Sequence, residues 1–134
     1  MITEVKKNLF TVDKEYALAH CISYDLAMGK GIAVEFQKKY NLREKIRPLL
    51  KDWPDCIFVN NVFNLITKQN YWKKPTYKTL VLALLKMKDI ALENNIKKIA
   101  MPKIGCGLDR LQWGVVREHL DNIFFNEEIL VCCL

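Results

Sequence analysis

The sequence predicts an α/β domain in which helices cover both faces of a mixed central sheet. Apolar and β-branched runs, typical of buried strands, alternate along the chain with segments whose apolar residues recur at helical spacing. Two glycine turns stand between such strands and helices. This alternation is typical of a layered α/β fold. With 134 residues the chain is long enough to bury one core, so we expect a single domain over residues 1–134.

The first half of the chain contains a predicted strand, two helical segments and a hairpin. Residues 15–23 (EYALAHCIS) have the composition of a buried strand, and residues 31–40 (GIAVEFQKKY) have helical spacing. A short helical piece at residues 43–50 is interrupted by a proline. Residues 55–67 (DCIFVNNVFNLIT) are rich in β-branched and aromatic residues, which predicts two strands joined at an Asn-Asn pair.

The second half contains two predicted helices and two strands. Pro75 and Thr76 provide a start signal for a helix. Its expected apolar face comprises Tyr77, Leu80, Val81, Leu84, Met87, Ala91 and Leu92. Residues 96–101 (IKKIAM) form a strand that a proline closes, and residues 127–134 (EEILVCCL) form the last strand. The helix between them has Trp113, Val116, Leu120, Ile123 and Phe124 on one face.

Composition and charge narrow the class of protein. The N-terminal residues lack the apolar run of a signal peptide, and the longest apolar run, residues 80–85, is too short to span a membrane. We therefore expect a soluble cytoplasmic protein, or a nucleoplasmic one in a eukaryote, with no membrane partner. The net charge of +6 fits either an anionic partner or a solvated basic surface.

The cysteine content predicts free thiols. The chain has five cysteines, an odd number, and they lack C-x-x-C spacing. Most lie in strand-like runs, which favours buried free thiols over disulfides or a zinc site. They are Cys21, Cys56, Cys106, Cys132 and Cys133.

Two turns, MGKGIA (residues 28–33) and IGCGLD (residues 104–109), place Gly-x-Gly after a strand and before a helix. At this junction of an α/β sheet, free N–H groups and the helix dipole favour an anion. Neither turn completes a P-loop or a G-x-G-x-x-G motif, which excludes the ATPase and Rossmann dinucleotide classes. The alternative is that each glycine only supplies a positive φ at a tight turn.

Five motifs in chain order, LAHCIS, MGKGIAVEF, LITK, KPTY and MPKIGCGLDRLQW, resemble the macrodomain family and closely its terminal ADP-ribose protein glycohydrolase branch. The resemblance covers nearly the whole chain. It implies a macrodomain-like three-layer sandwich with ADP-ribose lying across the strand ends, and a site without a metal or another cofactor.

The resemblance also implies the substrate-binding residues. Two loops, Gly29 to Gly31 and Gly105 to Leu108, would cradle the diphosphate. Leu9 would lie beside the adenosine, Ser23 near the distal ribose and Leu134 at the edge of the pocket. Asn8 stands where the family usually has an aspartate that accepts a hydrogen bond from the adenine amino group; its amide oxygen accepts the same bond without the charge. The alternative for Asn8 is an ordinary turn residue. The full implied set is Asn8, Leu9, Ser23, Gly29, Gly31, Lys103, Ile104, Gly105, Cys106, Gly107, Leu108 and Leu134.

Lys68 and Asp109 match the nucleophile and the general acid/base of this branch. Taken alone, Lys68 could equally be a solvated lysine at the end of a strand, and Asp109 is well placed to cap the following helix. In the matched roles, the lysine amine would form a Schiff base with the distal ribose, and the aspartate would move protons.

The predicted function is hydrolytic release of terminal ADP-ribose from acidic protein side chains or DNA bases. The expected partners are ADP-ribose and ADP-ribosylated protein or DNA, and we expect a monomer. Three alternatives stay open: a reader that binds ADP-ribose without hydrolysis, an ADP-ribose 1″-phosphatase or O-acetyl-ADP-ribose deacetylase, and a basic nucleic-acid-binding module. No cluster of metal ligands favours a metallophosphatase.

Three further features have a simple structural interpretation. Cys106 lacks a neighbouring histidine in its motif, so we interpret it as a packed loop residue rather than a nucleophile. His20 is expected to be a satisfied buried histidine. The stretch NYWKKPTY pairs aromatics with lysines as a nucleic-acid patch does, but the commoner interpretation is a loop that packs Trp72 beside solvated lysines.

Overall fold

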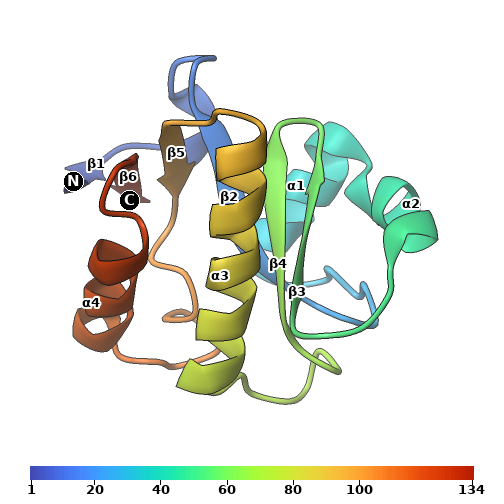
Figure 1. Ribbon diagram of the computed structural model, residues 1–134. Coiled ribbons are helices and arrows are strands. Elements are labelled where there is room, and N and C mark those ends of the chain that lie inside the picture. Colours follow the sequence, from blue (N-terminus) through green and yellow to red (C-terminus); the bar gives the residue numbers. More distant parts are fainter.

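A six-stranded sheet runs through the middle of the molecule, with two helices on each face (Figure 1). The computed structural model describes all 134 residues. The strands are β1 (Ile2–Lys6), β2 (Ala17–Ser23), β3 (Asp55–Val59), β4 (Val62–Lys68), β5 (Lys98–Met101) and β6 (Glu128–Cys133). The helices are α1 (Ile32–Tyr40), α2 (Leu42–Ile46), α3 (Tyr77–Glu93) and α4 (Trp113–Ile123), with short 3-10 turns η1 (Leu9–Thr11) and η2 (Arg47–Leu49).

The sheet is mixed, as predicted. Its strand order is β1-β6-β5-β2-β4-β3, and every neighbouring pair is parallel except the β3–β4 hairpin. The carboxyl ends of the parallel strands therefore meet at one edge, which is where α/β sheets bind ligands.

Two apolar cores lie on opposite faces of this sheet. Successive side chains of a strand point to opposite faces, so Ala19 of β2 contacts the core under α3 and α4, whereas Leu18 contacts the core under α1 and α2. Leu84 of α3 and Phe36 of α1 are fully buried in these two cores. Complete burial of such a side chain contributes about 1.5–3 kcal/mol. The predicted three-layer sandwich is confirmed.

The turn and cap signals in the sequence correspond to observed structure. Asn60 and Asn61 both have positive φ, 54° and 62°, as a two-residue hairpin turn requires. Thr76 caps α3, and its side chain and that of Thr79 form a reciprocal capping box. Leu92 was predicted to be on the buried face of α3, but it is 54% exposed. The buried face passes through Met87 and Ala91, and the next residue along the helix points about 100° away from it.

Strand β1 was not predicted. Its five residues, ITEVK, are short and carry two charges, and it pairs with β6 alone at the edge of the sheet. Charged side chains are common on edge strands because one side of such a strand faces solvent. Only the partner strand makes this segment a strand.

None of the helices is both long and apolar enough to cross a membrane.

Candidate active site

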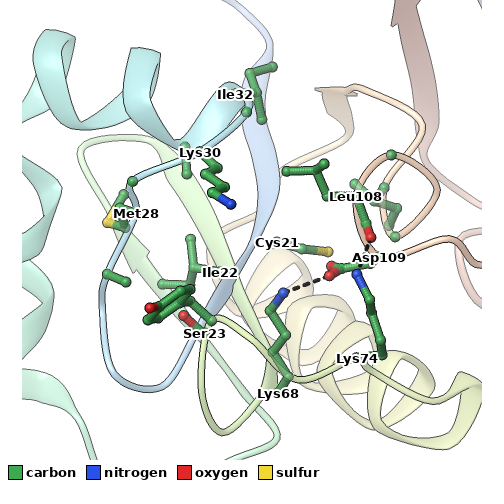
Figure 2. Close-up of a pocket in the computed structure, with 18 of the residues that line it drawn as sticks. Cys21, Ile22, Ser23, Met28, Lys30, Ile32, Lys68, Lys74, Leu108 and Asp109 are labelled. Atoms are coloured by element: carbon green, nitrogen blue, oxygen red, sulfur yellow. Dashed lines mark hydrogen bonds and ion pairs between the residues drawn. The ribbon is translucent and has the colours of Figure 1, made fainter.

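A cavity of about 720 Å³ opens at the carboxyl ends of β2, β4 and β5 (Figure 2). Its walls are the two glycine turns predicted from the sequence, which face each other across it, and its floor includes the end of β4 with Lys68. We call residues 24–31 the first loop and residues 102–111 the second loop. The parallel arrangement of the strands brings these distant segments to one edge of the sheet.

The first loop is held by Arg43 and Asp25, whose own side chains do not line the cavity. The Arg43 guanidinium donates to the carbonyl oxygens of Leu26, at 2.8 Å, and Ala27, at 2.5 Å. The Asp25 carboxylate accepts from the Ser23 hydroxyl at 2.5 Å, the Ala27 N–H at 3.1 Å and the Tyr71 N–H at 3.0 Å. Burial raises the pKa of Asp25, but these hydrogen bonds outweigh burial and hold the pKa below its ordinary value.

The second loop is held from inside the cavity. The Lys74 ammonium donates to the Leu108 carbonyl oxygen, and the Lys68 ammonium donates to Asp109 Oδ1 at 2.6 Å. Within the loop, the Leu111 N–H donates to the Gly105 carbonyl at 2.8 Å. Both lysines line the cavity, so a ligand there would meet the groups that position this loop.

Each loop contains one glycine that its own conformation requires and one that it does not. Gly31 and Gly105 have φ of +63° and +72°, values that other residues rarely adopt. Gly29 and Gly107 have no positive φ, and a Cβ on Gly107 would meet nothing within 4 Å. A positive φ therefore explains Gly31 and Gly105 only. A missing side chain at Gly29 and Gly107 leaves open space beside the backbone N–H groups.

Lys68 and Asp109 form a partly buried ion pair between β4 and the second loop. Each side chain is 14% exposed. Asp109 does not cap α4, because the N-cap residue of that helix is Gln112. The Asp109 carboxylate instead faces Lys68 in the cavity (Figure 2). The interpretations of Lys68 as a solvated strand end and of Asp109 as a helix cap are therefore wrong.

Two other reactive groups near the cavity are not activated. Burial, with a smaller contribution from the neighbouring Asp109 and Cys106, raises the pKa of the Cys21 thiol to about 12, so this residue is a neutral thiol. Burial also raises the pKa of Cys106, whose Sγ contacts the Ile104 carbonyl oxygen at 3.2 Å. Cys106 is thus a packed loop residue, as predicted. All five cysteines are free.

His20 is buried, as the sequence predicts, but only one of its two ring nitrogens has a hydrogen-bond partner. It is fully buried, stacks on Phe36 with ring centroids 3.8 Å apart, and its Nε2 lies 2.6 Å from Asn64 Oδ1. Burial lowers its pKa to about 4, which keeps the ring neutral, and Nδ1 has no partner. Nor does any group of three or more His, Cys, Asp or Glu side chains stand together as a metal site.

The structure brings most of the predicted site residues together. Those that line the cavity are Ser23, Gly29, Gly31, Lys68, Lys103, Ile104, Gly105, Gly107, Leu108 and Asp109. Four others do not line it. Asn8 Oδ1 accepts a hydrogen bond from the Phe10 N–H at 2.9 Å and so caps η1. Leu9 lines a second cavity of about 370 Å³. Cys106 packs against the apolar core, and Leu134 is exposed after the end of β6. Their ligand contacts stay predictions.

The sequence analysis missed several cavity residues. They are Cys21, Ile22, Ala27, Met28, Ile32, Ala33, Tyr71, Trp72, Lys74 and Pro102, whereas Lys30 lies within the predicted diphosphate loop. Trp72 was expected to pack under its loop, but it is 63% exposed, and Tyr71 beside it is 56% exposed. The signal that could have found them is their position: the segment follows Lys68 directly, so it leaves the sheet at the ligand-binding edge.

The fold has close relatives among solved structures. The macrodomain of Mycobacterium tuberculosis DarG superposes with a TM-score of 0.88 at 23% identity, covering 100% of this chain and 98% of that one. A Thermosipho africanus DarTG structure in complex with ADP-ribose superposes with a TM-score of 0.80 at 15% identity, covering 99% of this chain and 42% of that one. These likenesses establish the fold.

Sequence comparison establishes the family. Residues 19–120 match the Macro domain family, and the chain belongs to it. It is 40% identical over 134 residues to a human protein named ADP-ribose glycohydrolase OARD1, covering 97% of this chain and 88% of the relative. It is 28% identical over 138 residues to a DNA ADP-ribosyl glycohydrolase of Mycobacterium tuberculosis, covering 92% of this chain and 39% of that protein.

Proposed function

We propose that this macrodomain is an ADP-ribose glycohydrolase that releases terminal ADP-ribose from modified acidic side chains or nucleobases. The observation that carries the proposal is the Lys68–Asp109 pair, 2.6 Å apart, in a cavity walled by two glycine loops. The names of the OARD1 relatives and of the mycobacterial glycohydrolase support the same reaction.

In this proposal the two loops bind the diphosphate. The open space at Gly29 and Gly107 lets phosphate oxygens approach the backbone, and the N-terminus of α1 follows the first loop directly. Lys30 lines the same cavity and forms no ion pair, and Figure 2 shows its side chain reaching toward the space between the loops. It is therefore a cation available to a phosphate.

The reaction would proceed by covalent catalysis. Asp109 accepts a proton from Lys68, and the freed amine attacks C1″ of the distal ribose while the carrier leaves with a proton. Opening of the ribose ring gives a Schiff base between Lys68 and C1″. Water then adds to C1″, the C–N bond breaks, and ADP-ribose and the amine are regenerated. The net reaction consumes one water and releases one carrier.

A reader of ADP-ribose is the first competing function. Binding alone requires the loops but not an amine paired with a carboxylate at the ribose end, so the Lys68–Asp109 pair favours hydrolysis. The phosphatase and deacetylase alternatives use the same cavity, and substrate choice distinguishes them.

The test combines turnover with chemical trapping. Lys68→Ala should abolish release of ADP-ribose from glutamate-linked and DNA-linked substrates while much of the affinity for free ADP-ribose, measured by calorimetry, is retained. Lys86→Ala, an exposed lysine of α3 without an ion pair, is the matched control. Borohydride added during turnover should leave an ADP-ribose-sized mass on the peptide that contains Lys68. Release by Lys68→Ala at the parent's rate would overturn the assignment of the nucleophile.

A further inference from the structure

An exposed aromatic pair stands beside the proposed reaction centre. Tyr71 and Trp72 line the same cavity as Lys68, yet both are more than half exposed. Scattered exposed apolar residues are ordinary, but two adjacent large aromatics at the rim of a ligand cavity form a patch of the kind that binds partners.

The pair is held in place rather than left at the tip of a loose loop. The Tyr71 N–H donates to Asp25 Oδ2 at 3.0 Å, and two backbone hydrogen bonds, Tyr24 N–H to Lys68 and Asp25 N–H to Gln69, join this segment to the first loop. The rings of Tyr71 and Trp72 meet edge to face, with centroids 5.2 Å apart and an interplanar angle of 89°. The edge-to-face contact makes the two rings one unit with ring surface left toward solvent.

The position of the pair indicates which part of a substrate it would meet. Tyr71 is three residues beyond Lys68, and Asp25, which holds it, is two residues beyond Ser23, the register partner of Lys68. If Lys68 attacks C1″, as the proposed function requires, the group attached to C1″ leaves the cavity beside these rings. The rim therefore contacts the carrier rather than the adenosine end of ADP-ribose.

The charges around the pair suit a phosphate backbone. Lys73 is exposed and forms no ion pair, Lys30 is unpaired across the cavity, and the chain carries a net charge of +6. The cavity lining contains lysines but no arginine. Lysine binds phosphate as a point charge, so these side chains can attract a phosphate backbone without fixing its orientation.

We propose that Tyr71 and Trp72 form a stacking platform for a nucleobase, so that the carrier is a single-stranded nucleic acid. This inference rests on the proposed glycohydrolase function. An aromatic face stacks any base, and lysines beside it follow the strand. A base inside a duplex is already stacked and would first have to be extruded at the cost of its stacking and pairing, which favours a single strand. A modified glutamate has no ring for the platform to contact.

The test compares two carriers. Trp72→Ala and Tyr71→Ala are assayed on an ADP-ribosylated single-stranded oligonucleotide and on a peptide with ADP-ribosyl-glutamate. On the oligonucleotide, kcat/KM should fall at least about fivefold for Trp72→Ala, the lower end of what one stacked base contributes. The loss on the peptide should be clearly smaller, and Trp72→Phe should recover most of the oligonucleotide activity.

Phe125→Ala is the matched control, because Phe125 is 67% exposed but lies just before β6, at the amino ends of the parallel strands and away from the cavity. It should change neither activity. Equal losses on both carriers would overturn the inference and assign the rings to ADP-ribose itself. A larger loss on the peptide would also overturn it and point to a protein carrier.

A binding measurement separates this inference from the proposed function. Fluorescence anisotropy with an unmodified single-stranded oligonucleotide of about 10 nucleotides requires no turnover and fits the size of such sites. Trp72→Ala should bind at least about fivefold more weakly with an unchanged salt slope, whereas Lys73→Ala should reduce the slope by about 0.7. If the parent releases ADP-ribose from neither carrier, the proposed function fails. If Trp72→Ala binds the oligonucleotide as the parent does, the platform fails.

Discussion

The two glycine loops face each other across one cavity, but they are positioned by different means. Arg43 and Asp25 hold the first loop, and neither side chain lines the cavity. Lys68 and Lys74 hold the second loop, and both line it. A ligand at the first loop therefore does not engage Arg43 or Asp25 directly, although two of the donors to Asp25, Ser23 and Tyr71, line the cavity. At the second loop, any group that engages Lys68 also competes for a support, so binding, loop position and chemistry are linked there.

The largest expected effect is at the carboxylate that joins the second loop to β4. Asp109→Ala removes both the proposed proton acceptor and the 2.6 Å contact with Lys68. We expect kcat for ADP-ribose release to fall about 10²- to 10⁴-fold, the range typical of a lost acid/base group. Affinity for ADP-ribose should also weaken, and more than in Lys68→Ala, because in the proposed function the Asp109 carboxylate can also accept hydrogen bonds from the hydroxyls of the distal ribose.

Steady-state kinetics and calorimetry on one preparation measure both effects. Asp121→Ala, a change in an exposed aspartate of α4, is the control and should alter neither. If Asp109→Ala retained kcat within a few fold, Asp109 would be a structural brace and another group would move the proton.

The two glycines of the second loop should respond in opposite ways. Gly107→Val places its side chain in open space at an ordinary φ, so the fold should survive while ADP-ribose binding is lost. Gly105→Ala forces alanine to φ +72° and places Cβ 3.1 Å from Leu111 Cδ1, which should cost about 1–2 kcal/mol of stability. Thermal unfolding and calorimetry distinguish the two. Unchanged affinity in folded Gly107→Val would remove this glycine from the site.

Much of the fold was predictable because its signals are local. The Asn60–Asn61 turn, the Thr76 cap and the periodicity of α3 each act within a few residues, and all three predict the observed element. Strand β1 has no such signal, since its identity depends on hydrogen bonds from β6, more than 120 residues away in the sequence.

The site was predictable only in part, for the same reason. The motifs around Lys68 and Asp109 mark both residues, but their 2.6 Å contact follows from the strand order, which no local pattern specifies. The exposed position of Trp72 depends on Asp25 holding the backbone of Tyr71, a contact between residues 46 apart. For Asn8 the sequence offered two roles, and the structure shows the local one: its amide oxygen caps η1, as a turn residue does, whereas the contact with adenine stays a prediction.

The contribution of Asp25 to the stability of the folded protein should be lost at low pH. The pKa of Asp25 is lower in the folded protein than its ordinary value of 3.8, so the charged carboxylate stabilises the fold fully above that value. The stabilisation is lost as the pH falls through the lowered pKa. Asp25→Asn, which cannot accept all three hydrogen bonds equally, should destabilise the protein by about 1 kcal/mol at pH 7, since solvent screens this exposed carboxylate.

Thermal unfolding of the parent and of Asp25→Asn, measured from pH 7 down to below the lowered pKa of Asp25, tests this expectation. The difference between them should disappear in acid, whatever other groups do, because those groups are common to both proteins. A difference that stayed constant down to the lowest pH would mean that the carboxylate is not the support.

The smallest expected effects are those of replacing Lys30, which belongs to the first loop, and Lys74, which holds the second loop. Lys30 forms no ion pair, and no hydrogen bond within the protein holds its ammonium, so Lys30→Ala should leave the first loop in place and remove only attraction for the diphosphate. We expect affinity for ADP-ribose to fall about two- to fivefold, as for an exposed charge pair, and the difference from the parent to shrink with added salt. Lys74→Ala should weaken binding to a similar extent, but its effect should persist in salt, because the lost hydrogen bond to Leu108 is a support of the second loop rather than a charge on the ligand. Calorimetry at low and high salt decides between them: equal salt dependence of the two variants would mean that the loops are held alike, and that the contrast between them does not extend to ligand binding.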